Sequence, residues 1–392
     1  MIDKVSIQDC ALCGACINAC PVDAITLSKP YLDFCYPDID VNRCIHCNEC
    51  EKACPILGEK SKPEDGFPIA FAARSKDDSV RMRSSSGGIF YELASYILAE
   101  GGYICGAVFD EDFHVRHIVS NTQKDLRRMM GSKYAQSDVG YCYREIREKL
   151  DAGERVLFSG CPCQVAGLRS YLGKPYQGLL LVELICHGIP GDRMLQTYIG
   201  MREKQYGAKL KQLAFRNKAK GWHNSSVRME FENGKTYQEA MTQDTYMQGY
   251  FRCITLRESC FSCRFRNYAS GGDLIIGDFW GAEIEAPDID DNKGISAVIV
   301  ASKKGNAFLK SIPLPCYPVE IETILRYNQG LVSSFRVGAQ RPEFYEYAAK
   351  YSLEKAIAIF LQEKLLQKIK RKVRFILRCA WHVAQRKGKP LY

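Results

Sequence analysis

The N-terminal part of this chain is built on two cysteine runs, residues 10–21 (CALCGACINACP) and residues 44–55 (CIHCNECEKACP). Each run has the order Cys-x2-Cys-x2-Cys-x3-Cys-Pro. This spacing supplies three thiolates to one [4Fe-4S] cluster and the fourth thiolate to a second cluster. We therefore predict two ligand sets, which are Cys10, Cys13, Cys16 and Cys54 for one cluster and Cys44, Cys47, Cys50 and Cys20 for the other.

Zinc sites and disulfides are the alternatives for such runs. Zinc ligands usually come as two separated pairs, and disulfides need an oxidising compartment. The chain has 19 cysteines, and its N-terminus lacks the basic-then-apolar pattern of an export signal. We therefore expect a cytoplasmic protein whose cysteines bind metal clusters.

Composition is ordinary for a globular protein, with 46% hydrophobic and 25% charged residues in 392. This length allows a small cluster-binding module and one large domain. Residues 361–392 hold ten Lys and Arg against one acidic residue, so they account for the whole net charge of +9. No apolar run approaches the length of a membrane-spanning helix.

The larger part of the chain reads as alternating strands and helices. Strands are expected at 69–73, 103–109, 114–120, 155–159 and 179–185, and a further buried strand at 295–301. Residues 156–158 and 179–185 are almost continuously apolar, which is typical of parallel strands buried on both faces. Ligands gather at the carboxyl ends of such strands, and Cys163 and Cys186 follow two of them.

A third cluster site is indicated by four cysteines in this part. The Cys260-x2-Cys263 pair and the single thiols of Cys163 and Cys186 have the number and softness that an iron–sulfur or zinc site needs. Cys161 competes with Cys163 for the same role. The alternative is that these cysteines pack as small buried hydrophobes.

A small polar loop, Arg83-Ser84-Ser85-Ser86-Gly87-Gly88, directly precedes the helical pattern of residues 89–98. Free N–H groups at the start of a helix suit a phosphate. Serines at this place are equally ordinary helix caps, so the loop alone leaves both interpretations open.

The order of six motifs resembles a known family. Ser-Ser-Ser-Gly-Gly, Gly-Ser-Lys-Tyr-Ala-Gln-Ser, Cys-Pro-Cys-Gln-Val-Ala-Gly-Leu, Cys-His-Gly, Ser-Cys-x2-Cys and Ile-Gly-Asp-Phe-Trp-Gly follow one another between residues 84 and 281. Together they resemble the beta subunits of hydrogenases and dehydrogenases that use the deazaflavin coenzyme F420. The resemblance covers residues 69–310, with the N-terminal cluster module fused in front.

This resemblance implies a flavin, FAD in most members, near an iron–sulfur cluster. It implies Cys163, Cys186, Cys260 and Cys263 as ligands of a third [4Fe-4S] cluster. It also implies that two loops lie at the flavin, through Ser85, Ser86, Gly87, Gly88, Ser132, Lys133, Tyr134 and Gln136. Asp278 follows a strand end, where it could either bond the flavin or cap a turn.

The expected fold is an α+β ferredoxin module (residues 1–62), an α/β mixed-sheet flavin domain (63–340) and a helical C-terminal tail (341–392). The expected function is a flavin-dependent oxidoreductase that takes electrons from a ferredoxin-like donor and reduces a small organic acceptor. Similar fused proteins occur beside polysaccharide-assembly genes, so a role there is one expectation. The alternatives are an electron-transfer subunit of a larger complex and a deazaflavin oxidoreductase, because one fold hosts several functions.

A reductase of this kind needs a proton source near the acceptor. His187, next to Cys186, is the first candidate because the pKa of histidine lies near neutrality, and a structural role is its alternative. His223 is the second candidate.

The basic tail shows apolar residues at helical spacing among Lys and Arg residues. It is expected to pack as an ordinary helix, to lie on the inner face of an anionic membrane, or to bind a partner protein. No motif for nucleic-acid binding accompanies its charge.

Overall fold

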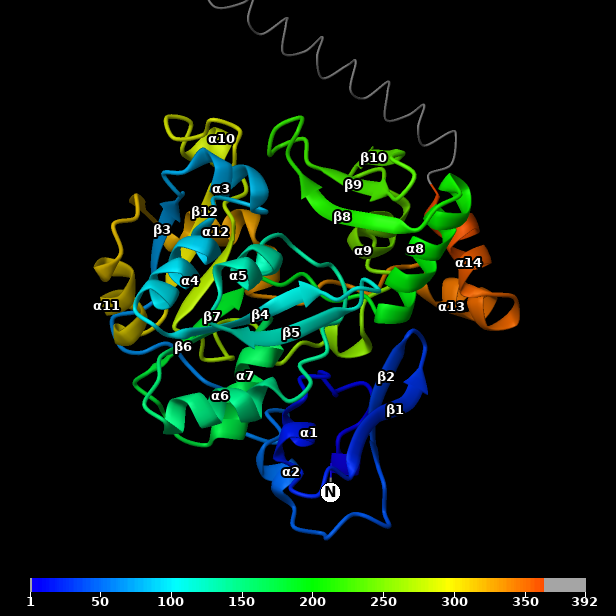
Figure 1. Ribbon diagram of the computed structural model, residues 1–392, viewed down its shortest axis with the longest axis horizontal. Helices are drawn as coiled ribbons and strands as arrows, with labels where there is room; N and C mark the ends of the chain where they lie inside the picture. The colour runs from blue at the N-terminus through cyan, green and yellow to red at the C-terminus, as the bar shows by residue number, and fades with distance from the viewer. Residues whose placement is uncertain (1, 363–392) are drawn as a thin grey trace, which may run out of the picture.

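The computed structural model of the chain describes residues 2–362 (Figure 1). The predicted basic tail helix therefore lies outside the described residues, except for its first two. Among the described residues, no helix has both the length and the apolar character needed to cross a membrane.

A mixed sheet of eight strands forms the centre of the large domain, in the order β13-β3-β12-β11-β7-β6-β4-β5. The strands are β3 (Ile69–Ala73), β4 (Tyr103–Phe109), β5 (Val115–Ser120), β6 (Val156–Gly160), β7 (Leu179–Leu184), β11 (Leu274–Asp278), β12 (Ser296–Val300) and β13 (Cys316–Val319). The strands β11, β7, β6 and β4 are parallel neighbours. The prediction of parallel, doubly buried strands is thus confirmed for β6 and β7. The expected strands β4 and β5 pair as an antiparallel hairpin.

Helices cover both faces of this sheet (Figure 1). They are α3 (Asp78–Arg83), α4 (Ile89–Ala99), α5 (Gln123–Met129), α6 (Cys142–Asp151), α7 (Pro162–Leu172), α10 (Ala282–Glu285), α11 (Lys303–Ser311) and α12 (Ile321–Tyr327). Leu157 of β6 belongs to the core under α4, α5 and α11, whereas Phe158 belongs to the core under α6 and α7. Burial on both faces explains why the central strands are continuously apolar.

A second, three-stranded antiparallel sheet was absent from the sequence-based expectations. It consists of β8 (Leu210–Asn217), β9 (Ser226–Phe231) and β10 (Thr236–Ala240). Its core continues into the helices α8 (Asp192–Tyr206), α9 (Thr245–Phe251), α13 (Arg341–Lys350) and α14 (Leu353–Ala356) and the π-helical turn Ile357–Leu361. We call this part the small lobe.

The N-terminal module, at the bottom of Figure 1, contains the short turn Ile2–Lys4, α1 (Ala15–Ala19), β1 (Ile25–Tyr31), β2 (Phe34–Ile39) and α2 (Glu49–Lys52). The strands β1 and β2 pair as an antiparallel hairpin between the two cysteine runs. Its tip reaches the small lobe, because Asp33 accepts hydrogen bonds from the Tyr345 hydroxyl (2.6 Å) and from the Gly191 backbone N–H (3.1 Å). Burial raises the pKa of this carboxyl to about 6.

Side chains of the large domain bind the backbone of the first cysteine run. Arg144 of α6 donates to the carbonyl oxygens of Asn18 (2.8 Å) and Cys20 (2.6 Å). The Tyr143 hydroxyl lies 2.8 Å from the carbonyl oxygen of Cys13, and Ser259 donates to that of Cys10 (3.0 Å). Since unpaired buried carbonyls are costly, these bonds fix the module in one orientation on the large domain.

Candidate functional site

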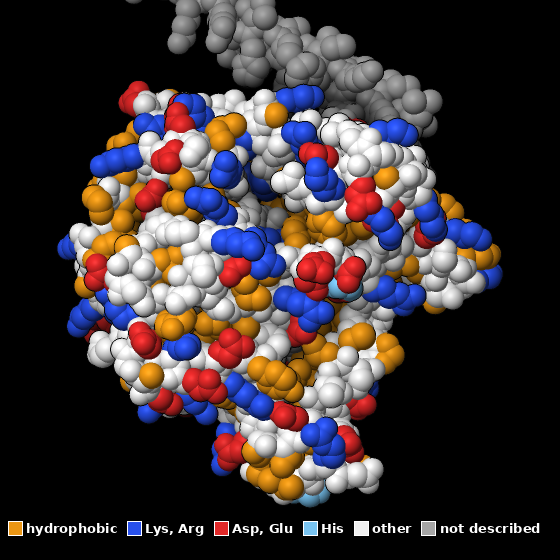
Figure 2. Space-filling view, in the orientation of Figure 1, with side chains coloured by type: hydrophobic (Ala, Val, Ile, Leu, Met, Phe, Trp, Pro, Cys, Tyr) orange, Lys and Arg blue, Asp and Glu red, His pale blue; other side chains and the backbone are white. Residues whose placement is uncertain are grey.

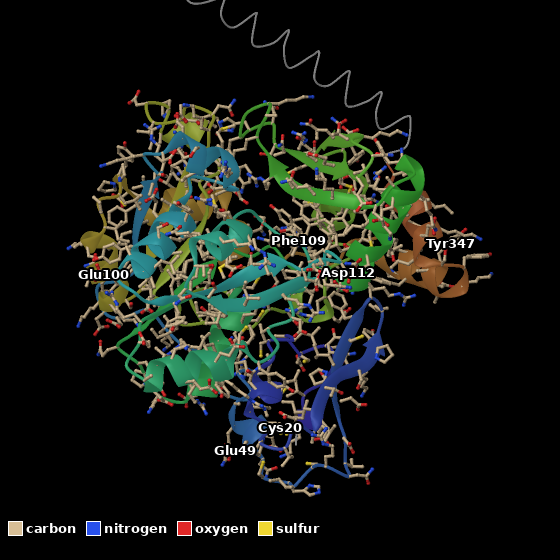
Figure 3. All side chains as sticks on the ribbon, viewed as in Figure 1. Cys20, Glu49, Glu100, Phe109, Asp112 and Tyr347 are labelled. Atoms are coloured by element: carbon tan, nitrogen blue, oxygen red, sulfur yellow. The ribbon has the colours of Figure 1, made fainter. Side chains whose placement is uncertain are left out.

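The cysteines of the N-terminal module gather in two groups. The thiols of Cys10, Cys13, Cys16 and Cys54 lie close enough to affect one another electrostatically. The other four, Cys20, Cys44, Cys47 and Cys50, line one small cavity. Figure 3 shows Cys20 inside the module, near α2 and its Glu49. Each group thus combines three cysteines of one run with the fourth of the other, as the spacing predicts.

Five cysteines of the large domain gather where α7 begins, β7 ends and the short 3-10 turn Glu258–Cys260 lies. The thiol of Cys163 lies near those of Cys186, Cys260 and Cys263, and Cys161 lies next to Cys186. These are the four predicted ligands of the third cluster and the one competitor. Four soft thiolates fit a [4Fe-4S] cluster, so the group holds enough of them for one.

Two arginines that the sequence analysis did not single out border this cysteine group. Arg257 is almost fully buried, and its Nη2 lies 3.6 Å from the Cys163 sulfur. Arg266 donates to the carbonyl oxygens of Cys186 (2.7 Å) and His187 (3.0 Å). A hydrogen bond from Cys161, together with these positive charges, lowers the pKa of the Cys186 thiol to about 7. Both arginines favour thiolates, which are the form that binds a metal.

A cavity of about 1290 Å³ lies between the large sheet and the small lobe. Its wall includes Cys161, Cys163 and Cys186 and every predicted flavin-binding residue except Gly87. Figure 2 shows the molecule hollowed between these two parts, with Lys and Arg side chains around the hollow. Five Lys and Arg residues line the cavity against two acidic ones, so an anionic ligand is favoured there.

The two predicted flavin loops meet in this wall. Ser85 Oγ lies 2.7 Å from Ser132 Oγ and accepts from the Ser132 backbone N–H at 2.7 Å. Gly87 has no room for a side chain, because a Cβ there would lie 2.5 Å from the Ala73 carbonyl oxygen. Gly88, at φ 90°, leads directly into α4. The N-terminus of α4 therefore faces the cavity, as a phosphate site requires.

Two of the predicted flavin-binding side chains are already bound within the protein. The Lys133 ammonium donates to the carbonyl oxygens of Arg128, Met129 and Met130 (2.8–3.0 Å) and so caps α5. Burial lowers the pKa of Lys133 to about 7. Gln136 donates to the Leu12 carbonyl oxygen (3.3 Å) and accepts from Arg257. Both residues thus shape the wall, and Gln136 also joins it to the N-terminal module.

Asp278, at the end of β11, forms a two-bond ion pair with Arg216 of β8, with both distances 3.0 Å. It also accepts from Trp222 Nε1 at 2.9 Å. Trp222 stacks on Trp280 with 5.4 Å between ring centroids, and Trp280 is 38% exposed in the cavity wall. Arg216 and the tryptophan pair were missed by the sequence analysis, although Trp280 lies within the quoted Asp-Phe-Trp-Gly motif.

Three histidines line the cavity, and their partners differ. Both ring nitrogens of His117 are bound, to Ser137 Oγ (2.6 Å) and to the Ser159 carbonyl oxygen (3.1 Å). His187 packs on Phe335 with 3.8 Å between ring centroids, and burial and Arg266 lower its pKa to about 4. Neither ring has a carboxylate partner in the hydrogen bonds of the described residues.

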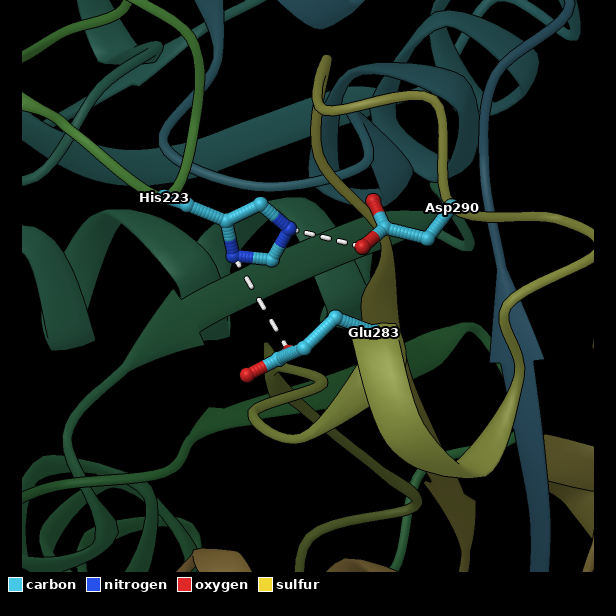
Figure 4. A group of neighbouring side chains, drawn as sticks. All are labelled: His223, Glu283 and Asp290. Carbon is cyan, nitrogen blue, oxygen red and sulfur yellow. Dashed lines mark hydrogen bonds and ion pairs between the residues drawn. The ribbon is translucent and has the colours of Figure 1, made fainter. Parts of the chain in front are cut away.

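His223 lies between two carboxylates (Figure 4). Its Nε2 is 2.7 Å from Asp290 and its Nδ1 is 4.0 Å from Glu283. The three ligand atoms lie within 4.8 Å of one another, which also makes the group a candidate for binding a metal ion. Each ring nitrogen nevertheless faces a different carboxylate, so the arrangement suits holding a proton better than chelation. An Asp–His pair of this kind fixes the tautomer of the ring.

Family models match three parts of the chain. Residues 70–141 match the N-terminal part, and residues 153–314 the C-terminal part, of the coenzyme F420 hydrogenase/dehydrogenase beta subunit. Residues 9–56 match a 4Fe-4S dicluster domain.

Two curated relatives come from methanogens. One is a subunit of the F(420)H(2) dehydrogenase of Methanosarcina mazei, which is 26% identical over 209 residues, covering 47% of this chain and 57% of the relative. The coenzyme F420-dependent sulfite reductase of Methanocaldococcus jannaschii is 25% identical over 360 residues, covering 87% of this chain and 52% of the relative. The chain thus spans about half the length of the curated relatives it matches.

A solved structure of the F420-reducing [NiFe] hydrogenase complex from Methanosarcina barkeri also matches. The likeness has a TM-score of 0.43 at 19% identity and covers 69% of this chain and 91% of the solved chain.

Proposed function

Since this chain belongs to the family of coenzyme F420 hydrogenase/dehydrogenase beta subunits, we propose that it is an iron–sulfur flavoprotein oxidoreductase. In this proposal it takes single electrons from a ferredoxin-like donor and reduces an organic acceptor. The cofactors are two [4Fe-4S] clusters in the N-terminal module, a third held by Cys163, Cys186, Cys260 and Cys263, and FAD in the cavity.

One observation carries this proposal, namely the composition of the cavity wall. The wall contains both predicted flavin loops and thiols of the third cysteine group. Its volume of about 1290 Å³ exceeds the roughly 300–1,000 Å³ of an ordinary ligand pocket, which leaves room for an acceptor beside a cofactor. A flavin bound there would collect two electrons from a cluster, one at a time, and together with a proton pass them on as a hydride.

The residues of the wall have separate tasks in this proposal. The start of α4 and the Ser85–Ser132 contact, which both lie in the cavity wall, hold the anionic part of the cofactor, because the first N–H groups of a helix suit an anion. The Asp278–Arg216 ion pair makes this part of the wall electrically neutral, and the Arg216 guanidinium lies 5.1 Å from the centre of the Trp280 ring. Trp280, which is 38% exposed in the cavity wall, offers an aromatic surface for a ring of the cofactor or acceptor.

Protein purified without oxygen should contain about twelve irons and about one flavin per chain. Iron and flavin assays check this, followed by a screen for compounds that reoxidise the reduced protein. The screen should contain coenzyme F420, sulfite and keto-sugar nucleotides, which separate the family alternatives from a role in polysaccharide assembly. Protein without flavin would contradict the proposal.

A second candidate function is an electron-transfer subunit of a larger complex. The observation that favours it is a group of exposed apolar residues around the second cysteine run, with Val41 68%, Ile45 59% and Leu57 47% exposed. One curated relative is itself named as a subunit. Reduced protein that no compound reoxidises, but that a partner complex does, would support this function instead.

His223 is the better placed of the two proposed proton donors. Hydride addition to a carbonyl carbon leaves an oxyanion, which then takes a proton from a nearby acid. Because Asp290 accepts from Nε2 at 2.7 Å, Nδ1 remains for the proton that is delivered. We expect His223→Gln to lower the turnover number of acceptor reduction by about 100-fold or more, with iron and flavin unchanged, as steady-state kinetics would show.

The matched control is His114→Gln. His114 also pairs with a carboxylate, Asp192 at 2.8 Å, but it does not line the cavity. It should leave turnover unchanged. If His187→Gln lost turnover with its cluster content intact while His223→Gln kept turnover, His187 rather than His223 would be the proton donor.

A further inference from the structure

Lys218 is a buried cation that backbone oxygens hold in place. It directly follows β8 in the small lobe, and it is 2% exposed. Its ammonium donates to three carbonyl oxygens, those of Arg81 (2.7 Å), Ser86 (2.6 Å) and Lys293 (2.8 Å). All three belong to the large domain, so this one side chain crosses from the small lobe to the back of the loop of residues 83–88.

The carboxylates near Lys218 are already paired with other cations. Asp278 and Asp291 both act on its ammonium electrostatically, and burial lowers the pKa of this lysine to about 7. Asp278 is bonded to Arg216 at 3.0 Å, and Asp291 to Arg81 at 2.7 Å. Lys218 itself belongs to none of the ion pairs within residues 2–362. Since buried charges rarely lack a counter-charge, this surplus positive charge favours an anion nearby.

The loop of residues 83–88 directs two of its carbonyl oxygens into the protein. The Ser86 oxygen accepts from Lys218, and the Gly87 oxygen accepts from the Ser75 N–H at 2.7 Å. Since the C=O and N–H of one trans peptide point in opposite directions, the Gly88 N–H is directed away from Ser75. Ser86 and Gly88 line the cavity, whereas Lys218 and Ser75 do not.

The donors of the same loop remain available. Within residues 2–362, no acceptor binds the backbone N–H of Ser86 or of Gly88. Unpaired N–H groups in a cavity wall, with the neighbouring oxygens bound on its far side, suit a phosphate. The space behind the loop is also closely filled, because a Cβ at Gly294 would lie 2.6 Å from both the Lys218 Nζ and the Ser86 oxygen.

We propose that Lys218 is a positioning residue of an anion site in the cavity wall: it holds the Ser86 carbonyl away from the cavity and supplies positive charge behind the loop that receives the phosphates of the cofactor. This inference rests on the proposed function, in which FAD occupies the cavity. It concerns the phosphates alone, because a flavin ring without phosphates gives Lys218 no anion to attract.

The test compares the binding of FAD with that of riboflavin, which has the same ring but no phosphate. Fluorescence titration of the full chain, depleted of flavin, gives both dissociation constants. Wild-type protein should bind FAD more tightly than riboflavin. Lys218→Met should weaken FAD binding by about tenfold or more, because the loop loses both the charge and the donor behind it, and should leave riboflavin binding unchanged. Lys218→Arg, which keeps the charge and the donors, should retain most of the affinity for FAD.

The matched control is Lys304→Met. The Lys304 ammonium also donates to a backbone carbonyl, that of Leu179 (2.5 Å), but Lys304 does not line the cavity or contact the loop. The control should bind FAD as tightly as wild-type protein. Iron content and the free energy of unfolding are measured for every variant, so that general damage to the fold is recognised. If Lys218→Met does not fold, Lys218→Gln, which keeps a donor but no charge, takes its place.

Two results would overturn the proposal. Unchanged affinity for FAD in the uncharged variant would mean that Lys218 does not support an anion site. An equal loss of affinity for FAD and riboflavin would mean that Lys218 maintains the shape of the cavity and not a phosphate site. Wild-type protein that binds neither flavin would instead contradict the proposed function itself, so the two failures are distinguishable.

Discussion

The substitution Cys260→Ser or Cys263→Ser should remove the third cluster and leave the two N-terminal clusters in place. Iron should fall from about twelve to about eight per chain, and reduction of the acceptor should be lost. Dithionite should still reduce the N-terminal clusters, because their eight proposed ligands all lie in residues 10–54. Iron analysis and EPR of the reduced protein measure both effects.

The loss is expected to be large because electrons have no substitute route in the proposed arrangement. The N-terminal module touches the large domain next to the third cysteine group, where Ser259 binds the Cys10 carbonyl and Gln136 joins Leu12 to Arg257. The matched control is Cys253→Ser. Its sulfur is 3.4 Å from His187 Nε2, but it is not a proposed ligand. Equal iron loss in Cys253→Ser would mean that the substitutions damage the fold in general. Full iron in both Cys260→Ser and Cys263→Ser would contradict the third cluster.

The sequence was most informative where chemistry depends on local spacing. The residue spacing in the two cysteine runs predicts which four cysteines lie together. In the structure Cys20 lies with the second run and Cys54 with the first. Cys163 and Cys186 were predicted to lie together because both follow buried parallel strands, and β6 and β7 are indeed neighbours.

Contacts between distant segments could not be predicted in the same way. Arg216 meets Asp278 across 62 residues, and Arg257 meets Cys163 across 94. A charged residue gives no sign in the sequence of which partner it will have after folding. The Arg216–Asp278 pair forms only when the small lobe packs against the large sheet, and this packing is determined by the whole fold.

Two missed features did have a local signal. The Asn233-Gly234 pair between β9 and β10 is a strong hairpin signature, and Val227, Met229 and Phe231 alternate with polar residues. Lys133 follows closely on the end of α5, where lysine often binds the last carbonyls of a helix. Its assignment to the flavin came from the family resemblance alone.

The position of the N-terminal module depends on one glycine of α7. A Cβ at Gly167 would lie 2.9 Å from the Cys13 Cβ and 3.0 Å from its sulfur. Helix α7 therefore carries Cys163 in its first turn and touches a proposed ligand of the module one turn later, ~6 Å along the axis. This close approach brings the first and third cysteine groups side by side and explains why a residue unfavourable in helices stands here.

Gly167→Ala should destabilise the protein by about 1–3 kcal/mol, although alanine is the better helix former, because the added methyl group overpacks the contact with Cys13. The control, Gly200→Ala, is also inside a helix, but apart from the backbone of that helix nothing lies within 4 Å of its added Cβ. It should stabilise the protein by about 0.5–1 kcal/mol. Denaturant unfolding measures the change in the free energy of unfolding of both variants.

The larger substitution Gly167→Leu should displace the module from α7. Residues 58–66, which connect the module to β3, should then become sensitive to protease, and electrons from the donor should no longer reach the acceptor. Stabilisation by alanine at both glycines would mean that the module does not rest on α7, and the path from the first cluster group to the third would need another contact.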